Sequence, residues 1–144
     1  MSRGARVIGT ASPSNHESLR SLGAEPVAYG EGLAGRVRAL APRGVDLALD
    51  VAGSGVLPAL IQLTGGAEHV ITVADFAGSL EHGVRFSRGD SGRALYVLGE
   101  IGKLIESGRF SLPVALTFPL ADVAEAHRLS EQGSVRGKLV LLVR

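Results

Sequence analysis

Ala5-Arg6-Val7-Ile8-Gly9-Thr10-Ala11 is a short apolar stretch with β-branched residues, and it predicts a β-strand. Ser12 or Ser14 can cap the helix that follows, and Gly23 ends that helix. The next apolar run, Pro26-Val27-Ala28-Tyr29, predicts a second strand. A strand, a helix and another strand in so short a stretch indicate a parallel βαβ unit, and this pattern decides the fold.

The same alternation of apolar runs and helical patterns continues to the end of the chain. Leu33, Val37 and Leu40 lie at helical spacing, and Pro42 and Gly44 end that helix. Further strands are predicted at residues 45–51, 69–74, 84–87, 114–118 and 138–143, and helices at residues 33–41, 56–63, 93–107 and 119–132. We therefore expect an α/β fold with a mostly parallel sheet, flanking helices and extra C-terminal strands.

The composition is that of an ordinary globular protein with almost no net charge. The 144 residues include 15 Lys and Arg and 14 Asp and Glu, a formal net charge of +1, and 45% are hydrophobic. This length fits one domain. The balance of charge argues against a nucleic-acid or acidic-membrane partner. The absence of cysteine excludes a disulfide framework, thiolate zinc sites and thiol catalysis.

No targeting or membrane-spanning segment is recognisable in the sequence. Met1 is followed directly by a strand pattern rather than by the apolar core of a signal peptide. No apolar stretch approaches the roughly 18 residues that a bilayer-spanning helix needs. We therefore expect a cytoplasmic protein.

One glycine-rich segment has the spacing of a nucleotide-binding motif. Gly30-Glu31-Gly32-Leu33-Ala34-Gly35 lies between a strand and a helix, and Asp50 ends the next strand 20 residues after Gly30. Such a G-x-G-x-x-G motif can admit a pyrophosphate to a helix N-terminus, with the acid holding a ribose. However, the strand and the helix are short, and Glu31 would place a carboxylate beside the phosphates. A glycine-rich turn without a ligand is the alternative.

Candidate catalytic residues lie near the ends of predicted strands. Asp50 and Asp75 could form an acid–base pair, with Tyr29 and His16 as further candidates. Each aspartate also fits the simpler role of a turn or cap residue. No metal site is predicted, because no metal-ligand spacing connects the four histidines, His16, His69, His82 and His127.

Taken together, these segments resemble part of a known enzyme family. Residues 5–12 and 19–24 are similar to the second strand and the next helix of the medium-chain dehydrogenase/reductases, and residues 44–53 to their fourth strand. The tail from residue 108 to residue 141 is similar to the family's characteristic ending. The resemblance covers nearly the whole chain in the family's order, and it points to the zinc-independent, NADPH-dependent quinone and enone reductases.

The resemblance implies a truncated Rossmann-like fold with two parts. Residues 1–110 are expected to form an incomplete nucleotide-binding core, and residues 111–144 a strand–helix–strand extension that packs on the core or on a dimer partner. The family's phosphate-binding glycine motif lies between the first and second Rossmann strands, which would precede Met1. Residues 30–35 would then follow the third strand.

The resemblance also implies NADP as the cofactor and assigns residues to it. Thr10 and Ser12 match the end of the second strand, where these enzymes contact the adenosine ribose and its 2′-phosphate, and the absence of an acid there fits NADP. Asn15 is expected to add a contact, and Tyr29 to flank the adenosine. Small residues and turn formers are also expected at strand ends on structural grounds alone. The other residues expected near the cofactor are Val51, Gly53, Val73, Asp75, Phe76 and Lys138.

The N-terminal catalytic lobe and the first Rossmann strand of the family have no counterpart in these residues. That strand is central in the order 3-2-1-4-5-6, so its absence exposes two edges of the sheet. Buried, unpaired backbone groups cost about 1–3 kcal/mol each. We expect the sheet to close up, to pair in a homodimer or to accept a complementing N-terminal lobe. Residues 114–118 and 138–143 must pair with each other or across a dimer.

Three functions remain open from the sequence. The first is a remnant or fragment of an NADPH-dependent oxidoreductase that acts on quinones or α,β-unsaturated carbonyls. The second is a repurposed non-redox enzyme, such as a cyclase, dehydratase or isomerase, that uses the old cofactor cleft. The third is a non-catalytic assembly module that complements a separate polypeptide.

Overall fold

The computed structural model describes residues 4–88, 95–133 and 135–143. The chain divides into two compact units, Met1–Arg93 and Ala94–Arg144. Each unit is described by itself below. The division at residue 110, between a core and a C-terminal extension, stays a prediction.

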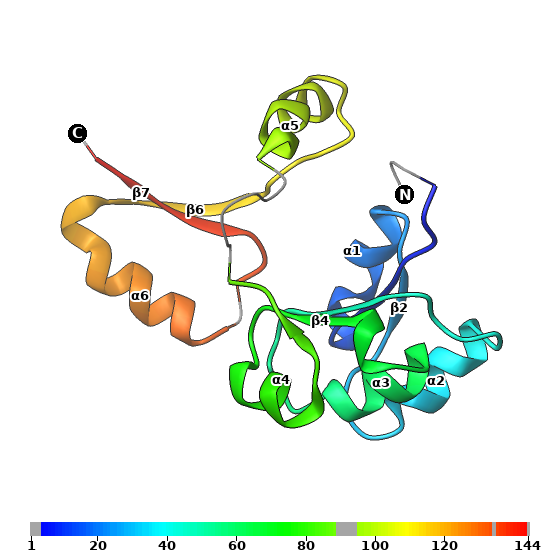
Figure 1. Cartoon of the computed structure of the whole chain (residues 1–144). Helices are drawn as coiled ribbons and strands as arrows, with labels where there is room; N and C mark the ends of the chain where they lie inside the picture. Colours follow the sequence, from blue (N-terminus) through cyan, green and yellow to red (C-terminus); the bar gives the residue numbers. More distant parts are fainter. Residues whose placement is uncertain (1–3, 89–94, 134, 144) are drawn as a thin grey trace. The chain divides into compact units, whose positions relative to one another are not determined.

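The first unit alternates strands and helices, as the sequence pattern predicts (Figure 1). Its strands are β1 (Ile8–Thr10), β2 (Glu25–Val27), β3 (Ala48–Asp50), β4 (Val70–Thr72) and β5 (Arg85–Phe86). Its helices are α1 (His16–Ser21), α2 (Leu33–Leu40), α3 (Leu57–Thr64) and α4 (Phe76–His82), with 3₁₀ turns η1 (Pro13–Asn15) and η2 (Ala67–His69). Every strand pairing in this unit is parallel, which confirms the predicted α/β class.

The strands of the first unit form two separate sheets. One sheet has the order β1-β2 and the other the order β3-β4-β5. Within the described residues, no strand pairs with the second edge of β1 or with the second edge of β3. The expected interruption of the sheet is therefore present between these two strands.

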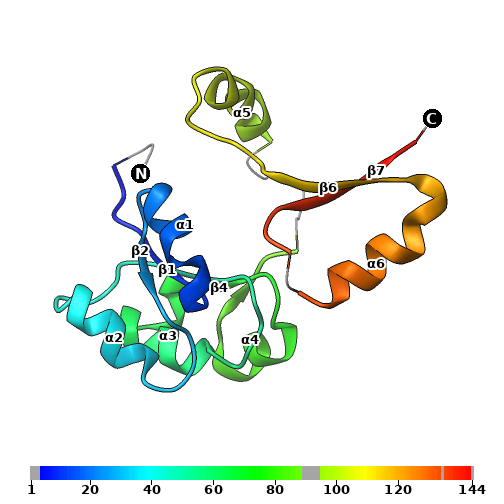
Figure 2. The same cartoon turned by 180° about the vertical axis from the view of Figure 1, so that it is seen from behind.

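A layer of helices lies under both sheets. Val27 of β2, Leu33 and Val37 of α2 and Leu63 of α3 form one buried cluster, against which Ile8 of β1 packs. A second cluster joins α3 to the other sheet through Leu57, Val70 and Val84. Figures 1 and 2 place α2, α3 and α4 on one side of the strands and α1 on the other. Helix α3 thus contributes to the packing under both sheets.

The second unit contains helix α5 (Tyr96–Glu106) and a parallel strand pair. Strands β6 (Val114–Pro119) and β7 (Lys138–Leu142) pair from Val114 opposite Lys138, with a shift of register between Val114 and Leu116, and η3 (Leu120–Asp122) and α6 (Val123–Glu131) connect them. Of the two alternatives left open by the sequence, these C-terminal strands therefore pair with each other.

The structure differs from the predicted elements mainly in length. The predicted strands 5–11, 45–51 and 69–74 shorten to three residues each, because only those residues have a paired neighbour. Helix α4 was not predicted; it begins where the Asp75 carboxylate accepts the amide of Gly78 and ends at Gly83 with φ +67°. Helix α5 begins at Tyr96, and the predicted helix residues 93 and 94 lie outside the described residues.

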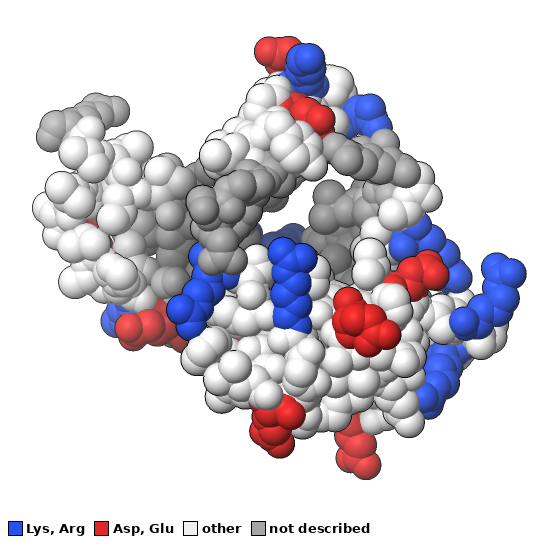
Figure 3. All heavy atoms as spheres, viewed as in Figure 1, with Lys and Arg blue, Asp and Glu red and all other residues white. Residues whose placement is uncertain are grey.

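The surface carries charges of both signs. On the face shown in Figure 3, basic and acidic side chains are interspersed over neutral surface. None of the helices in the described segments has both the length and the apolar character needed to cross a membrane.

Candidate functional site

The candidate site is formed by the loops that follow the carboxyl ends of the parallel strands in the first unit. In open α/β sheets this edge is where ligands bind. The structure places the predicted residues of this unit at the end of β1 or after β1, β2, β3 and β4, whereas Lys138 begins β7 of the second unit. The predicted residues at this edge are Thr10, Ser12, Asn15, Tyr29, Val51, Gly53, Val73, Asp75 and Phe76.

Asp50 holds the loop that follows β3. Its side chain is only 4% exposed, and its Oδ1 atom accepts the amides of Ala52 at 3.1 Å and Gly53 at 3.0 Å. Its Oδ2 atom accepts the hydroxyl of Thr72 at 2.8 Å. Burial acts to raise the pKa of Asp50, but the hydrogen bonds from Thr72, Gly53 and Ala52 together keep that pKa below its usual value. Asp50 is therefore a buried, charged residue that shapes this turn.

Thr72 holds the loop that follows β4 in the same way. Its fully buried hydroxyl accepts the amides of Ala74 at 3.2 Å and Asp75 at 3.0 Å while it donates to Asp50. The Thr72 hydroxyl therefore uses its one donor and both of its acceptor positions. Sequence reasoning did not single out Thr72. The available signal was a hydroxyl residue inside a predicted strand, two residues before the expected end of that strand at residue 74.

The loops after β3 and β4 are also in close backbone contact. Gly53 has φ +65°, and a Cβ built on it would lie 3.1 Å from the Cβ and 3.2 Å from the carbonyl oxygen of Ala74. Only glycine fits this position without displacing a neighbour. The structure thus brings together the segments around Gly53 and Asp75, two of the residues that the family resemblance places near the cofactor.

Asp75 caps helix α4. Its Oδ1 atom accepts the amide of Gly78 at 2.8 Å, and Ser79 donates its hydroxyl to the carbonyl of Phe76 at 2.7 Å. The two candidate acids, Asp50 and Asp75, therefore lie on adjacent loops joined by Thr72, and each carboxylate accepts hydrogen bonds from backbone amides.

An aromatic pair lies beside this cap. The rings of Phe76 and Phe86 meet edge to face with centroids 5.3 Å apart. The guanidinium carbon of Arg88 lies 4.6 Å from the Phe76 centroid and 5.6 Å from the Phe86 centroid, within the range of a cation–π interaction. Phe76 was expected at this edge from the sequence, whereas Phe86 and Arg88 join it only through the parallel pairing of β4 with β5.

A cluster of small polar side chains follows β1. The hydroxyls of Ser12 and Ser14 lie 3.0 Å apart, and Asn15 donates its Nδ2 to the Ser12 hydroxyl at 3.1 Å. His16 lies next to them, with Nε2 3.2 Å from the carbonyl oxygen of Ala11. No acidic residue occurs between Thr10 and His16. This donor set of hydroxyls, an amide and an imidazole suits the hydroxyls of a ribose or an anionic phosphate.

The glycine-rich segment after β2 forms a turn held by a helix residue. Gly30 and Gly32 have φ of +87° and +76°. Arg36 of α2 donates to the carbonyls of Ala28 at 2.9 Å, Tyr29 at 3.2 Å and Gly30 at 3.3 Å. The phenol of Tyr29 is exposed. The positive φ angles of this turn thus explain why Gly30 and Gly32 are glycines, and no ligand is needed for that explanation.

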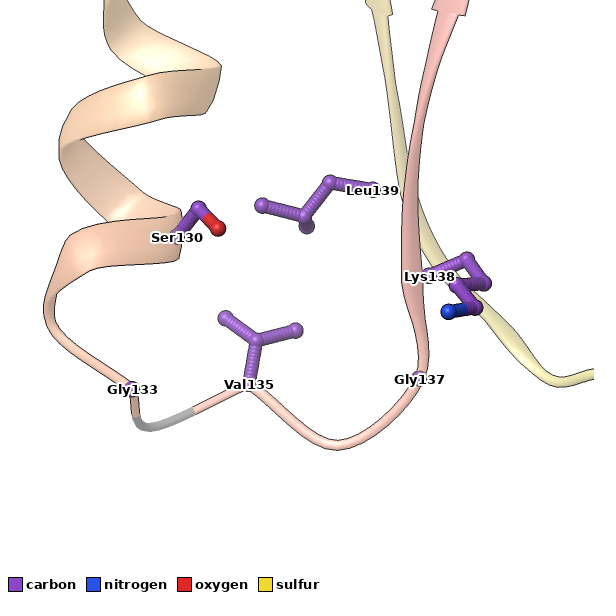
Figure 4. Close-up of a pocket in the computed structure, with 6 residues that line it drawn as sticks. All are labelled: Ser130, Gly133, Val135, Gly137, Lys138 and Leu139. Carbon is purple, nitrogen blue, oxygen red and sulfur yellow. The ribbon is translucent and has the colours of Figure 1, made fainter. Parts of the chain in front are cut away.

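Lys138 lies beside a small cavity of the second unit. The cavity, about 280 Å³, is lined by Ser130, Gly133, Val135, Gly137, Lys138 and Leu139. Figure 4 shows Leu139 pointing toward Ser130 and Val135, whereas the Lys138 side chain leaves the opposite face of β7. Adjacent strand residues alternate in this way. The ammonium group therefore does not point into this cavity.

The described residues do not offer a zinc site. None of their His, Asp and Glu side chains gather in groups of three or more, and the sequence has no cysteine. Tetrahedral zinc in proteins needs three or four such ligands.

Comparison with known proteins identifies the family. Residues 22–141 match the family described as zinc-binding dehydrogenase. The chain belongs to that family. The resemblance to medium-chain dehydrogenase/reductases is thereby confirmed at family level.

Solved structures of dehydrogenases share this fold. An NAD-dependent alcohol dehydrogenase is 29% identical with a TM-score of 0.76, over 98% of this chain and 45% of its own. The quinone oxidoreductase of Coxiella burnetii is 28% identical with a TM-score of 0.71, over 99% of this chain and 46% of its own. A mycobacterial protein complexed with NADPH, at 23% identity and a TM-score of 0.75 over 97% of this chain and 49% of its own, shares the fold.

This member of the zinc-binding dehydrogenases therefore spans less than half the length of these solved structures. No curated protein matched the sequence. The chain therefore resembles the Rossmann-like, nucleotide-binding part of medium-chain oxidoreductases.

Proposed function

We propose that these residues form the nucleotide-binding part of an NADPH-dependent oxidoreductase that acts on quinones or α,β-unsaturated carbonyls. The observation that carries the proposal is the polar cluster after β1, where Ser12, Ser14 and Asn15 gather without a carboxylate. NAD-binding enzymes use an acid at this point of the fold to hold the ribose, whereas a 2′-phosphate is accommodated by donors and cations. Quinones as substrates are supported by the similarity to the Coxiella burnetii quinone oxidoreductase. The α,β-unsaturated carbonyls come from the resemblance of the sequence to the quinone and enone reductases.

In this proposal the chain's own residues bind and orient the cofactor. Ser12, Ser14 and Asn15 would donate to the adenosine ribose and its phosphate, with Tyr29 beside the adenine. The loops fixed by Asp50 and Thr72 would present their backbone to the nicotinamide half. When bound, NADPH supplies the hydride, so the protein contributes position rather than acid–base chemistry.

The bonding of Asp50 favours this redox function over the repurposed acid–base enzyme. A general acid or base at neutral pH needs a pKa near the working pH. The hydrogen bonds to Asp50 lower its pKa, away from neutral pH, and its carboxylate already accepts three hydrogen bonds. Asp50 and Asp75 are therefore assigned to loop shape in this proposal.

Calorimetric titration of the purified chain with NADPH and with NADH tests the proposal. We expect weak binding of both, because the family's diphosphate loop is not among these residues, and roughly tenfold tighter binding of NADPH, equivalent to about 1.4 kcal/mol. Ser12→Glu should remove this preference because its carboxylate repels the 2′-phosphate. Ser21→Glu, on the exposed end of α1, is the matched control and should retain it. Equal affinities in the unsubstituted chain, or no binding of either up to millimolar, would contradict the proposal.

A further inference from the structure

An arginine lies over two aromatic rings at the carboxyl end of the β3-β4-β5 sheet. The guanidinium carbon of Arg88 is 4.6 Å from the ring centroid of Phe76 and 5.6 Å from that of Phe86. Phe86 ends β5, and Phe76 begins α4 directly after the loop that follows β4. The arginine therefore reaches from the end of one strand to the loop that follows the next.

The backbone on both sides of this contact is anchored. The amide of Ser87, the residue before Arg88, donates to the carbonyl of Thr72 at 2.9 Å. On the other side, the carbonyl of Phe76 accepts the hydroxyl of the buried Ser79 at 2.7 Å. Because both anchors are fixed and two rings restrict the guanidinium, Arg88 loses little further freedom when it binds a ligand.

The Arg88 side chain has hydrogen-bonding capacity that the protein does not use. A guanidinium has five N–H donors, and a cation–π contact leaves them available. Within the described residues, no protein oxygen forms a hydrogen bond or an ion pair with Arg88. The side chain is exposed, so an anion from solution can reach it. A carboxylate matches the guanidinium edge with two parallel hydrogen bonds.

An apolar surface lies directly beside these donors. Phe76 is 46% exposed even though the Arg88 guanidinium lies over its ring. A cation next to an open aromatic ring suits a ligand that has both a carboxylate and a flat apolar body. A small inorganic anion contacts the guanidinium alone and gains nothing from the ring.

Arg88 lies at the end of the sheet where the proposed function places the nicotinamide half of the cofactor. Thr72 connects the arginine to that region, because its hydroxyl accepts the amide of Asp75 and its carbonyl accepts the amide of Ser87. A substrate that receives a hydride must lie beside the nicotinamide. The residues proposed for the adenosine end follow β1, in the other sheet. Arg88 is therefore placed for the substrate rather than for the adenosine phosphates.

We propose that Arg88 binds a carboxylate of the substrate, which is a quinone or α,β-unsaturated carbonyl with a flat apolar body and a carboxylate attached to it. The inference rests on the proposed function for the reaction and adds the group that selects the substrate. Arg88 donates two hydrogen bonds to the carboxylate, and the open ring of Phe76 packs against the apolar body. Arg88 determines specificity and takes no part in hydride transfer.

A matched pair of ligands tests the inference without any nucleotide. The probes are anthraquinone-2-carboxylate and the uncharged anthraquinone-2-carboxamide, which differ in the anionic group. Each is titrated into the full 144-residue chain, and the dissociation constant is measured from nuclear magnetic resonance shifts of the backbone amides and of the Arg88 Nε–H group. We expect the carboxylate to bind at least tenfold more tightly than the carboxamide and to shift the Arg88 Nε–H signal.

Two glutamine variants show whether the preference depends on this arginine. Arg88→Gln should remove the preference for the carboxylate and change the affinity for the carboxamide by less than about twofold. Arg85→Gln is the matched control, because Arg85 is exposed on the same strand end but alternates with Phe86 to the other face of β5. This control should keep the full preference. Circular dichroism checks that both variants fold.

Inorganic pyrophosphate separates a substrate carboxylate from a cofactor phosphate. At millimolar concentration and constant ionic strength, it should not displace anthraquinone-2-carboxylate; displacement would assign Arg88 to a phosphate and overturn the inference. Equal affinities for the two probes would also overturn it, as would a preference that survives Arg88→Gln or that Arg85→Gln removes equally. Because no nucleotide is present, these results are independent of the NADPH titration, so failure of this inference and failure of the proposed function are distinguishable.

Discussion

The hydroxyl of Thr72 donates to the carboxylate of Asp50 at 2.8 Å, and this bond ties the loop after β3 to the loop after β4. Both residues are buried, and between them they accept four backbone amides. The pair therefore sets the shape of both loops at the carboxyl end of the sheet. Asp50 and Thr72 thus form a structural brace, a hydrogen-bonded pair that holds the two loops together, rather than a catalytic acid–base pair.

Thr72→Val should lower the free energy of unfolding by about 1–3 kcal/mol, because it leaves two amides and one carboxylate oxygen without their partner. Valine has nearly the same shape, so the loss reports the hydroxyl rather than a cavity. Urea denaturation measures the effect. Thr117→Val, at an exposed position of β6, is the control and should change stability by less than about 0.5 kcal/mol. Equal effects of the two substitutions would rule out the brace.

Asp50→Asn should destabilise the chain even though asparagine is isosteric. Its amide nitrogen would face a Thr72 oxygen whose two acceptor positions are already used by Ala74 and Asp75. We expect a loss of about 1–3 kcal/mol in urea denaturation. Asp46→Asn, at an exposed residue two positions before β3, makes the same chemical change without a buried partner, and a comparable loss there would contradict the argument.

The contribution of Asp50 to the free energy of unfolding should decrease as the pH is lowered into the acid range. Its pKa in the folded chain lies below the ordinary value of 3.8, so the charged carboxylate stabilises the fold fully above that pH. The stabilisation is lost as pH falls from about 3.8 through the folded pKa. The difference in unfolding free energy between the unsubstituted chain and Asp50→Asn should therefore stay constant from pH 7 to about 5 and shrink below about 4. A difference that grows in acid would show that the pKa is raised.

Gly53→Ala should be more harmful than Gly55→Ala. Both glycines have a positive φ, +65° and +70°, so alanine carries the left-handed penalty of about 1–2 kcal/mol at each. At Gly53 the new Cβ also meets Ala74 at 3.1 Å, whereas at Gly55 nothing lies within 4 Å. We expect an additional loss of roughly 1 kcal/mol or more at Gly53 from overpacking, measured by thermal or urea denaturation. Equal losses would mean that the two loops do not touch.

Gly137→Ala offers the same comparison in the second unit. A Cβ at Gly137 would lie 2.9 Å from the carbonyl oxygen of Pro113, which accepts the amide of Lys138 at 2.7 Å. Gly133 has a positive φ with open space around it. We expect Gly137→Ala to increase hydrogen exchange in β6 and β7 clearly more than Gly133→Ala does, because alanine at Gly133 carries only the left-handed penalty. The opposite ranking would contradict the close approach of the two strands.

Much of the fold could be predicted because its pattern is local. The runs 114–118 and 138–143 predict strands from composition alone, and the helix from Leu33 ends within one residue of its expected end. The family resemblance rests on the same local segments, and the match over residues 22–141 agrees with it. Helix α4 was not predicted because Gly78, a poor helix former, lies within this short segment, and because the start of the helix depends on the cap from Asp75.

The candidate site was predictable only in part, because its chemistry depends on which strands are neighbours. Asp50 and Asp75 were found from their places at strand ends, but the sequence could not distinguish a cap from a catalytic acid. The role of Thr72 follows from the register in which Asp50 lies opposite it. The contact of Arg88 with two phenylalanines likewise needs the pairing of β4 with β5.

The shared cluster of α2 and α3 has a mechanical consequence for the first unit. Because β1-β2 and β3-β4-β5 have no hydrogen-bonded seam between them in the described segments, cooperativity between the halves must pass through Val37, Leu63 and their neighbours. Weakening that apolar contact would let each half open at its own rate, so the coupling between the two halves depends on side-chain packing rather than on backbone hydrogen bonds.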